Sequence, residues 1–196
     1  MIVVLINTTI MERVETNGLS LEHIEDQTDE ICLAAVRQNC YAIRYVKNQT
    51  REICLEAIHH QNLCHESIRD MCRYSVLDHI RDQTEELCIA AVNGNGYALK
   101  FVREQTEEIC LAAVRKRGRV LQYVKNQTEE ICKEAIKSDK FSAFRYVRDQ
   151  TLELCMFAIT INKDIYSDIK DCEMKEICEK YIKEGSRFMR TKSAKK

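Results

Sequence analysis

Apolar residues recur along this chain in blocks about 22 residues apart. In one copy four of them are spaced i, i+1, i+4 and i+5, at Ile109, Cys110, Ala113 and Val114. This spacing places them on one face of a helix. Thr106 can cap that helix, acidic residues follow in its first turn, and basic residues collect before Gly118. We expect Gly118 to end the helix in the left-handed conformation, and we call this predicted element helix A.

A shorter apolar block follows each helix A, and we call it helix B. It occupies residues 41–46, 97–102, 120–124 and 141–147, and residues 19–24 start the series with this half of the unit. An Asx or Glu residue followed by Gln-Thr then begins the next helix A, at Asp26, Asn48, Asp82, Glu104, Asn126 and Asp149. Each unit therefore contains one long and one short helix, and neither can bury its apolar stripe alone.

The triplet Glu-Ile/Leu-Cys marks the period of these units. Its cysteines are 22, 34, 22, 22, 23 and 23 residues apart, at Cys32, Cys54, Cys88, Cys110, Cys132, Cys155 and Cys178. A fixed period of this size is typical of stacked repeats. The predicted fold is all-α, an α-solenoid of short two-helix repeats of about 22 residues. One continuous helix of eleven-residue repeats is an alternative, disfavoured by the regular breaks, and a leucine-rich repeat lacks its strand signature here.

Composition indicates a globular chain with no single-sign charge field. The 196 residues are 45% hydrophobic and 31% charged, with a net charge of −1 and no proline. The charge gives no global reason to expect nucleic acid or an anionic membrane as partner. The apolar start at residues 1–6 is too short for a membrane span and has no basic region before it, so we interpret it as the start of a helix.

The seven in-register cysteines are predicted to be buried, unpaired thiols. Equivalent positions of stacked helices lie roughly 9–10 Å apart, whereas a disulfide needs Cα atoms within about 7 Å. Free cysteine commonly packs as a small hydrophobe. Such a chain suits a reducing compartment.

The register breaks between Cys54 and Cys88, where twelve residues are inserted. The irregular unit spans residues 59–80 and holds four of the five histidines. His60, Cys64, His65 and Cys72 are weak zinc-ligand candidates. They lack a Cys-x-x-Cys motif, and we expect a structural insertion without metal or cofactor. His79 takes the helix B position that Tyr45 and Phe101 hold, so we expect it to be packed.

The repeat resembles a family of helical repeats of unknown function. The resemblance rests on Asn-Gly-x-Ala-Leu, on Leu-x-Ala-Val-x-x-Asn-Gly, and on Asn-Gln-Thr-Glu-Glu-Ile-Cys at residues 126–132. The family is abundant in giant DNA viruses of amoebae, of the mimivirus kind, and in some protists. The resemblance covers roughly residues 17–160 and fails in the 51–83 unit and after Thr160. It implies a viral repeat protein in an infected host cell, with no activity to transfer. Together with the free thiols it leads us to expect the host cytoplasm, with the virion or nucleus as alternatives.

Residues 1–184 are predicted to form a single array that ends in a capping helix near 173–184. Gly185 should end that helix. Residues 185–196 are basic, without an acidic residue after Glu184, and we expect a disordered tail. The end faces of an open array can self-associate.

We expect a non-enzymatic scaffold that binds a protein partner. No phosphate loop, nucleophile elbow or zinc-protease motif is present, and the Glu-Glu pairs recur at helix starts rather than once. Helix B positions that differ between units are the expected partner-binding residues: Arg44, Lys100, Gln122 and Arg145. The alternative is nucleic-acid binding through a basic stripe and the tail. The stripe comprises Arg115, Lys116, Arg117, Arg119, Lys125, Lys137, Lys140, Arg145 and Arg148.

Overall fold

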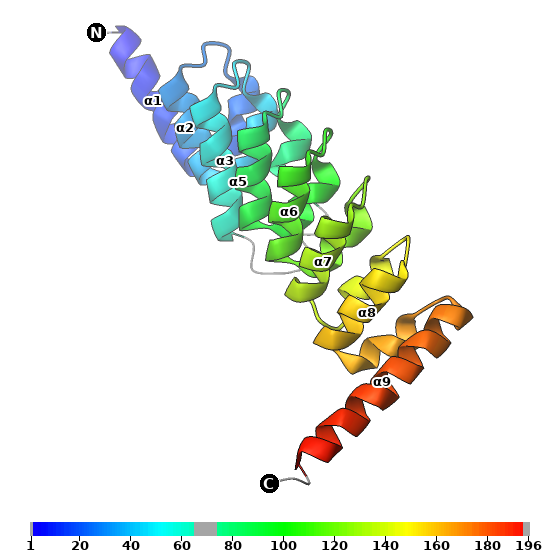
Figure 1. Cartoon of the computed structure of the whole chain (residues 1–196). Coiled ribbons are helices and arrows are strands. Elements are labelled where there is room, and N and C mark those ends of the chain that lie inside the picture. The colour runs from blue at the N-terminus through cyan, green and yellow to red at the C-terminus, as the bar shows by residue number, and fades with distance from the viewer. Residues whose placement is uncertain (1, 65–73, 194–196) are drawn as a thin grey trace. The chain divides into compact units, whose positions relative to one another are not determined.

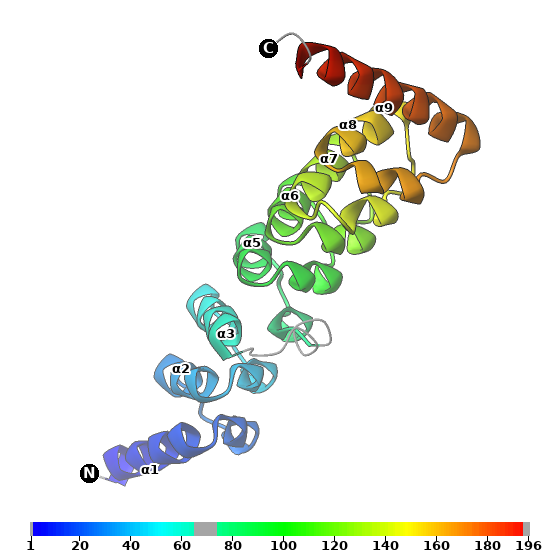
Figure 2. The ribbon, with the colours of Figure 1, turned by 90° about the horizontal axis from the view of Figure 1, so that it is seen from below.

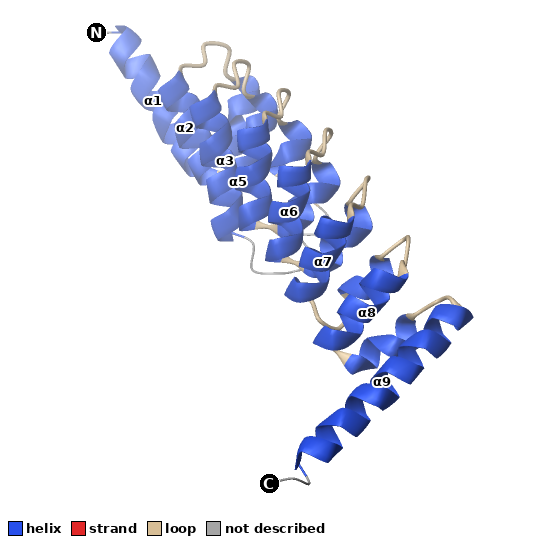
Figure 3. Cartoon of the chain, viewed as in Figure 1, coloured by secondary structure: helices blue, strands red, loops and turns tan. Residues whose placement is uncertain are grey.

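A computed structural model describes residues 2–64 and 74–193, and within these ranges the chain contains helices, turns and no strand (Figure 1, Figure 3). The all-α prediction is confirmed. The chain divides into two compact units, Met1–Lys116 and Arg117–Lys196. Each α-helix after the first corresponds to a predicted helix A, and each short helix after it to a helix B.

The first unit alternates α-helices with short 3-10 helices. Its elements are α1 (Ile2–Thr16), η1 (Gly18–His23), α2 (Asp29–Gln38), η2 (Cys40–Tyr45), α3 (Arg51–Cys64), η3 (Val76–His79), α5 (Glu85–Gly94), η4 (Gly96–Phe101) and α6 (Glu107–Lys116). Consecutive α-helices pack on one another, and so do consecutive 3-10 helices. Within this unit the α-helices form one layer and the 3-10 helices a second (Figure 2).

The second unit repeats this alternation. It contains η5 (Gly118–Tyr123), α7 (Glu129–Ser138), η6 (Ala143–Tyr146), α8 (Leu152–Ile161), η7 (Lys163–Asp168) and α9 (Cys172–Ser193). The core of both units consists of the predicted apolar stripe: the Ile/Leu, Cys, Ala and Val/Ile positions of α2, α5, α6, α7 and α8 are all at most 3% exposed.

The threonine caps are confirmed. The Ile109 N–H donates to Thr106 Oγ1 at 3.3 Å, and the same bond forms at the other helix A starts of the Gln-Thr type. Each bond satisfies one of the main-chain donors that the first turn of a helix leaves without a partner.

The prediction that glycine ends helix A in the left-handed conformation is wrong. Among the described residues no glycine has a positive φ. The chain leaves helix A through an extended residue instead, such as Asn95 with φ −139°. Gly118 is required by close packing, because a Cβ there would lie 2.2 Å from the Ala135 carbonyl oxygen. The glycine therefore lets η5 approach the carboxyl end of α7.

The insertion lengthens a helix A. α3 runs to Cys64 and is therefore longer than the other α-helices that begin at a Gln-Thr motif. Residues 65–73 of the insertion lie outside the described residues. Gln61, 5% exposed, fixes the chain where it returns. Its Oε1 accepts the Val76 N–H at 3.0 Å, and its Nε2 donates to the Tyr41 hydroxyl at 3.2 Å. The buried amide thus connects α3 to the starts of η2 and η3.

The predicted stop at Gly185 is also wrong. α9 passes through Gly185 and continues to Ser193, so most of the predicted tail is helical, and residues 194–196 lie outside the described part. No helix in the described part of the chain is both long enough and apolar enough to cross a bilayer.

Candidate functional site

Within each of the two units, a glutamine side chain ties one repeat, counted here as a 3-10 helix and the α-helix after it, to the next repeat. It is the glutamine of the Gln-Thr motif, and its Nε2 donates to the carbonyl oxygen at the end of the following 3-10 helix. The bonds are Gln27 to Tyr45 at 3.0 Å, Gln49 to His79 at 3.0 Å, Gln83 to Phe101 at 3.1 Å, Gln127 to Tyr146 at 3.0 Å and Gln150 to Asp168 at 3.2 Å. We call this series the glutamine ladder.

The other end of each amide also reaches the next repeat. The Oε1 accepts a main-chain N–H two residues further on, from Lys47, Arg81, Arg103, Arg148 or Lys170, at 2.8–3.0 Å. Every partner in the next repeat is thus a main-chain atom. The glutamine fixes the junction without specifying the side chains of the neighbouring repeat.

The repeated cysteine contacts the glutamine at the start of its own helix. The thiol sulfurs of Cys32, Cys110 and Cys132 are 3.8–3.9 Å from the Oε1 atoms of Gln27, Gln105 and Gln127. The expected burial is confirmed: all seven in-register cysteines are buried and free. Burial raises the pKa of Cys32, Cys54, Cys132 and Cys155 to about 11. A thiol with such a pKa stays protonated and is a poor nucleophile near neutral pH.

Basic side chains form a second set of junction contacts. The Arg103 guanidinium donates to the Arg81 carbonyl at 2.8 Å and the Ile80 carbonyl at 3.1 Å. Arg148, predicted as part of the nucleic-acid stripe, donates to the Lys125 and Val124 carbonyls at 2.8 Å. These guanidinium groups donate to main-chain carbonyls of the protein itself. Arg148 therefore has fewer N–H donors left for a phosphate.

The sequence interpretation missed the ladder. Its signal was visible, because glutamine stands before threonine at all six helix A starts, at Gln27, Gln49, Gln83, Gln105, Gln127 and Gln150. A capping role explained the threonine and the acidic residues of this motif. No role was assigned to the glutamine, so its recurrence was overlooked. A polar residue that never varies beside a buried stripe indicates a specific hydrogen bond.

In the first unit, the predicted partner-binding residues lie on the outer surface of the 3-10 layer. Arg44 and Lys100 are exposed, two repeats apart, and Glu22 and Asp78 are the exposed equivalents in the other two repeats. The Arg44 guanidinium lies 5.8 Å from the Tyr41 and Tyr45 ring centroids, and Lys100 Nζ lies 5.4 Å from that of Phe101. We call Glu22, Arg44, Asp78 and Lys100 the variable row.

His79 is packed beside this row, as predicted. It is half-buried, and its ring meets that of Tyr41 edge-on with centroids 6.3 Å apart. Burial lowers the pKa of His79, the positive charge of Arg44 lowers it further, and Asp78 opposes the shift. The neutral imidazole is therefore the favoured form here.

In the second unit, the two remaining candidates, Gln122 and Arg145, differ in their contacts. Gln122 is exposed, and its Nε2 donates only within its own helix, to the Arg119 carbonyl at 3.3 Å. Arg145 is exposed and pairs with Asp168 at 3.0 Å. Each candidate thus stands at the surface of its own unit, and Arg145 already carries a counter-charge.

The structure brings no metal-binding group together in the part that it describes. His60 is half-buried in α3 and Cys64 is the last residue of that helix, while His65 and Cys72 lie outside the described residues. No cluster of three or more potential ligands occurs among the described residues.

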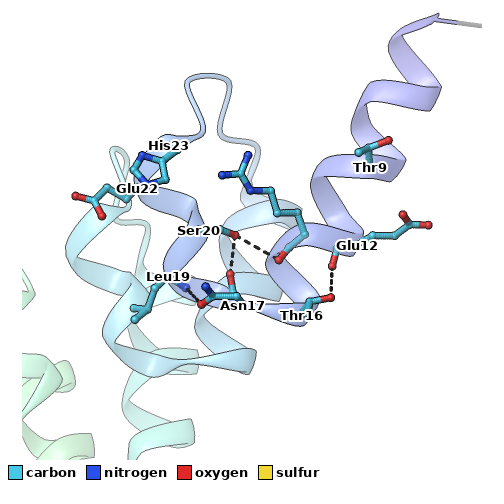
Figure 4. Close-up of a pocket in the computed structure, with 9 residues that line it drawn as sticks. Thr9, Glu12, Thr16, Asn17, Leu19, Ser20, Glu22 and His23 are labelled. Atoms are coloured by element: carbon cyan, nitrogen blue, oxygen red, sulfur yellow. Dashed lines mark hydrogen bonds between the residues drawn. The ribbon is translucent and has the colours of Figure 1, made fainter.

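A polar groove of about 680 Å³ lies between α1 and η1 (Figure 4). By the 22-residue register, Thr9 and Arg13 stand where α2 has the buried Ile31 and Ala35. Ser20 closes the base, its hydroxyl donating to the Asn17 carbonyl at 2.6 Å. Polar residues at apolar stacking positions suit a face that contacts water, and the sequence interpretation predicted a cap only at the other end.

Comparison with known proteins gives one family match and no activity. Residues 106–152 match the model of a domain of unknown function, DUF4116. That segment spans about two repeats, from α6 through η6. No curated protein and no solved structure matches the chain.

Proposed function

We propose that this protein is a non-enzymatic α-solenoid scaffold that binds a protein partner through the exposed residues of its 3-10 helices. The observation that carries the proposal is that the glutamine contacts that join the repeats do not involve the exposed side chains of the 3-10 helices. The glutamine ladder binds only main-chain atoms of the next repeat, so the side chains of the variable row can change without altering a junction. Solenoids offer extended surfaces of this kind to partners.

The finer identity is part of the same proposal. We propose a viral repeat protein that acts in the reducing cytoplasm of an infected host cell. The resemblance to repeats of giant DNA viruses supports the source, and the nine free cysteines of the described residues support the compartment.

Affinity capture from an amoebal host extract tests the scaffold. The test variant carries Arg44→Glu and Lys100→Glu in the variable row. Its control carries Arg115→Glu and Lys116→Glu, which change the charge equally and fall in the basic stripe. Far-ultraviolet circular dichroism checks that both variants keep the wild-type helix content.

We expect wild type and control to retain the same protein, the row variant to lose it, and nuclease to have no effect. Capture that fails equally in both variants, or that yields no protein above background, would count against the variable row. Loss in the stripe variant together with sensitivity to nuclease would instead establish the nucleic-acid alternative.

A further inference from the structure

The last helix leaves an apolar face open. By register with α8, Ile177 and Tyr181 of α9 stand at the Leu154 and Ala158 positions, which are 3% and 0% exposed. Ile177 and Tyr181 are 46% and 45% exposed. α9 contacts α8 through the neighbouring stripe, where Cys178 is fully buried with its sulfur 3.9 Å from that of Met156. Within the described part of this unit the Ile177–Tyr181 face has no covering helix.

The same helix leads into a purely basic segment. Residues 187–196 carry five cations and no acid, at Arg187, Arg190, Lys192, Lys195 and Lys196. In the preceding part of α9, from 173 to 184, Glu and Lys residues nearly balance. α9 therefore joins an apolar contact face at one end to a positive charge at the other, which favours an acidic partner surface with an apolar strip.

The first unit provides such a surface. Its four turns before α2, α3, α5 and α6 follow one another along one edge of the unit (Figure 3). We call them the acidic edge, residues 25–30, 47–52, 81–86 and 103–108. It holds eleven acidic and four basic residues, which leaves a charge of −7.

The basic residues of the acidic edge are all engaged within it. Lys47 Nζ donates to the Glu25 carbonyl at 2.8 Å, and Arg51 Nε donates to Glu86 at 2.7 Å. Arg81 and Arg103 donate to main-chain carbonyls of the preceding turn. The edge therefore presents mainly carboxylates to an approaching molecule.

An aliphatic strip runs beside the acidic edge. One half-buried residue per helix forms it, at Leu33, Leu55, Ile89 and Leu111 of α2, α3, α5 and α6. Where the strip begins, a groove of about 540 Å³ lies between α1 and α2. It is lined by Met11, Leu33 and Ala34 together with the polar residues Glu15, Glu30, Arg37 and Gln38. Four neighbouring helices span roughly 30 Å at the usual interaxial distance, and the 22 residues of α9 extend about 33 Å.

We propose that the protein self-associates head to tail, with α9 of one copy lying along the aliphatic strip of another copy. Ile177 and Tyr181 pack on the strip, and the positively charged carboxyl end of α9 is attracted to the acidic edge. Both surfaces occur on every chain and they differ from each other, so each contact is heterologous. The proposal is independent of the variable row.

Sedimentation velocity of the full chain, from low micromolar to roughly 0.5 mM, tests this association. Three variants divide the contact: Arg187→Glu with Arg190→Glu in the basic segment, Glu30→Lys with Glu52→Lys in the acidic edge, and Tyr181→Ala in the apolar face. The matched control, Lys140→Glu with Lys163→Glu, makes the same charge change at exposed residues outside α9. All samples are treated with nuclease first.

We expect wild type to form species larger than the monomer and to dissociate as salt rises from about 50 to 300 mM. Each test variant should raise the dissociation constant about tenfold or more. In the two charge-reversed variants attraction becomes repulsion, and Tyr181→Ala removes an aromatic side chain from the contact. Mixing the two charge-reversed variants should restore association between them, because the unchanged basic segment of one variant meets the unchanged acidic edge of the other. The control should match wild type. A wild type that stays monomeric, a control as weak as the variants, or a mixture that fails to associate would overturn the proposal.

Discussion

Replacing one amide of the glutamine ladder measures how strongly the ladder holds neighbouring repeats together. Gln127 lies within the second unit and makes three strong contacts. Its Nε2 donates to the Leu121 and Tyr146 carbonyls, each at 3.0 Å, and its Oε1 accepts the Arg148 N–H at 3.0 Å. Gln127→Ala removes all three and leaves the main-chain groups of Tyr146 and Arg148 to water.

The expected loss follows from these contacts. A typical hydrogen bond contributes about 0.5–1.5 kcal/mol net, so three bonds amount to roughly 2–4 kcal/mol. Arg148 is exposed, so water reaches its N–H once the amide is gone. We therefore expect the free energy of unfolding to fall by about 2–3 kcal/mol, measured by urea titration followed by circular dichroism. Hydrogen exchange of the Arg148 amide should accelerate as well.

Gln122→Ala is the matched control. It removes the same amide from the same unit, but Gln122 bonds only to the Arg119 carbonyl of its own helix. We expect less than about 0.5 kcal/mol for this exposed site. Equal losses for the two variants, or a Gln127→Ala protein with unchanged Arg148 exchange, would refute the assignment of junction strength to the ladder.

Three further changes test other parts of the frame. Cys110→Ala should cost about 1 kcal/mol and Cys110→Glu several times more, because the site is 3% exposed; similar urea midpoints for the two would contradict burial. Gly118→Ala should cost roughly 1–3 kcal/mol, since its Cβ would meet the Ala135 carbonyl, whereas Gly185→Ala inside α9 should stabilise by about 0.5–1 kcal/mol; a gain at both positions would exclude the close approach. The lowered pKa of His79 means that the unfolded chain binds its proton more readily. Its contribution to stability is therefore present above the unfolded pKa and is lost as pH falls through the folded one. His79→Phe should reduce the loss of stability between about pH 7 and 5, and an unchanged pH profile would rule this out.

The period of the chain could be predicted because each repeat contains the same apolar stripe. Ile109, Cys110, Ala113 and Val114 show the buried face directly. The role of Gly118 could not be predicted, because its requirement comes from a carbonyl seventeen residues away, at Ala135. Close approach and left-handed backbone both select glycine, and the sequence alone does not separate them.

The sequence predicted that the residues of the candidate site are exposed, but not the contacts that they make. Exposure of Arg44 and Lys100 follows from their place in the helix B pattern, but the rings that flank them come from local geometry that periodicity does not specify. The length of α9 was missed because Gly185 was taken as a stop, although glycine inside a helix costs only about 1 kcal/mol relative to alanine. The glutamine ladder could not be predicted, because the sequence does not show which main-chain carbonyls of the next repeat lie within reach of the amide.

The main-chain partners of the glutamine ladder bear on how such a chain can change length. A repeat brings its own amide donor and, at the end of its 3-10 helix, its own carbonyl acceptor. In one repeat the His79 carbonyl accepts from Gln49 of the repeat before, and Gln83 donates to Phe101 of the repeat after. Duplication or loss of one whole unit of the gene would therefore leave every remaining junction with a matched donor and acceptor. Unequal recombination could alter the reach of the protein in steps of one repeat, with no compensating mutation at the new junction.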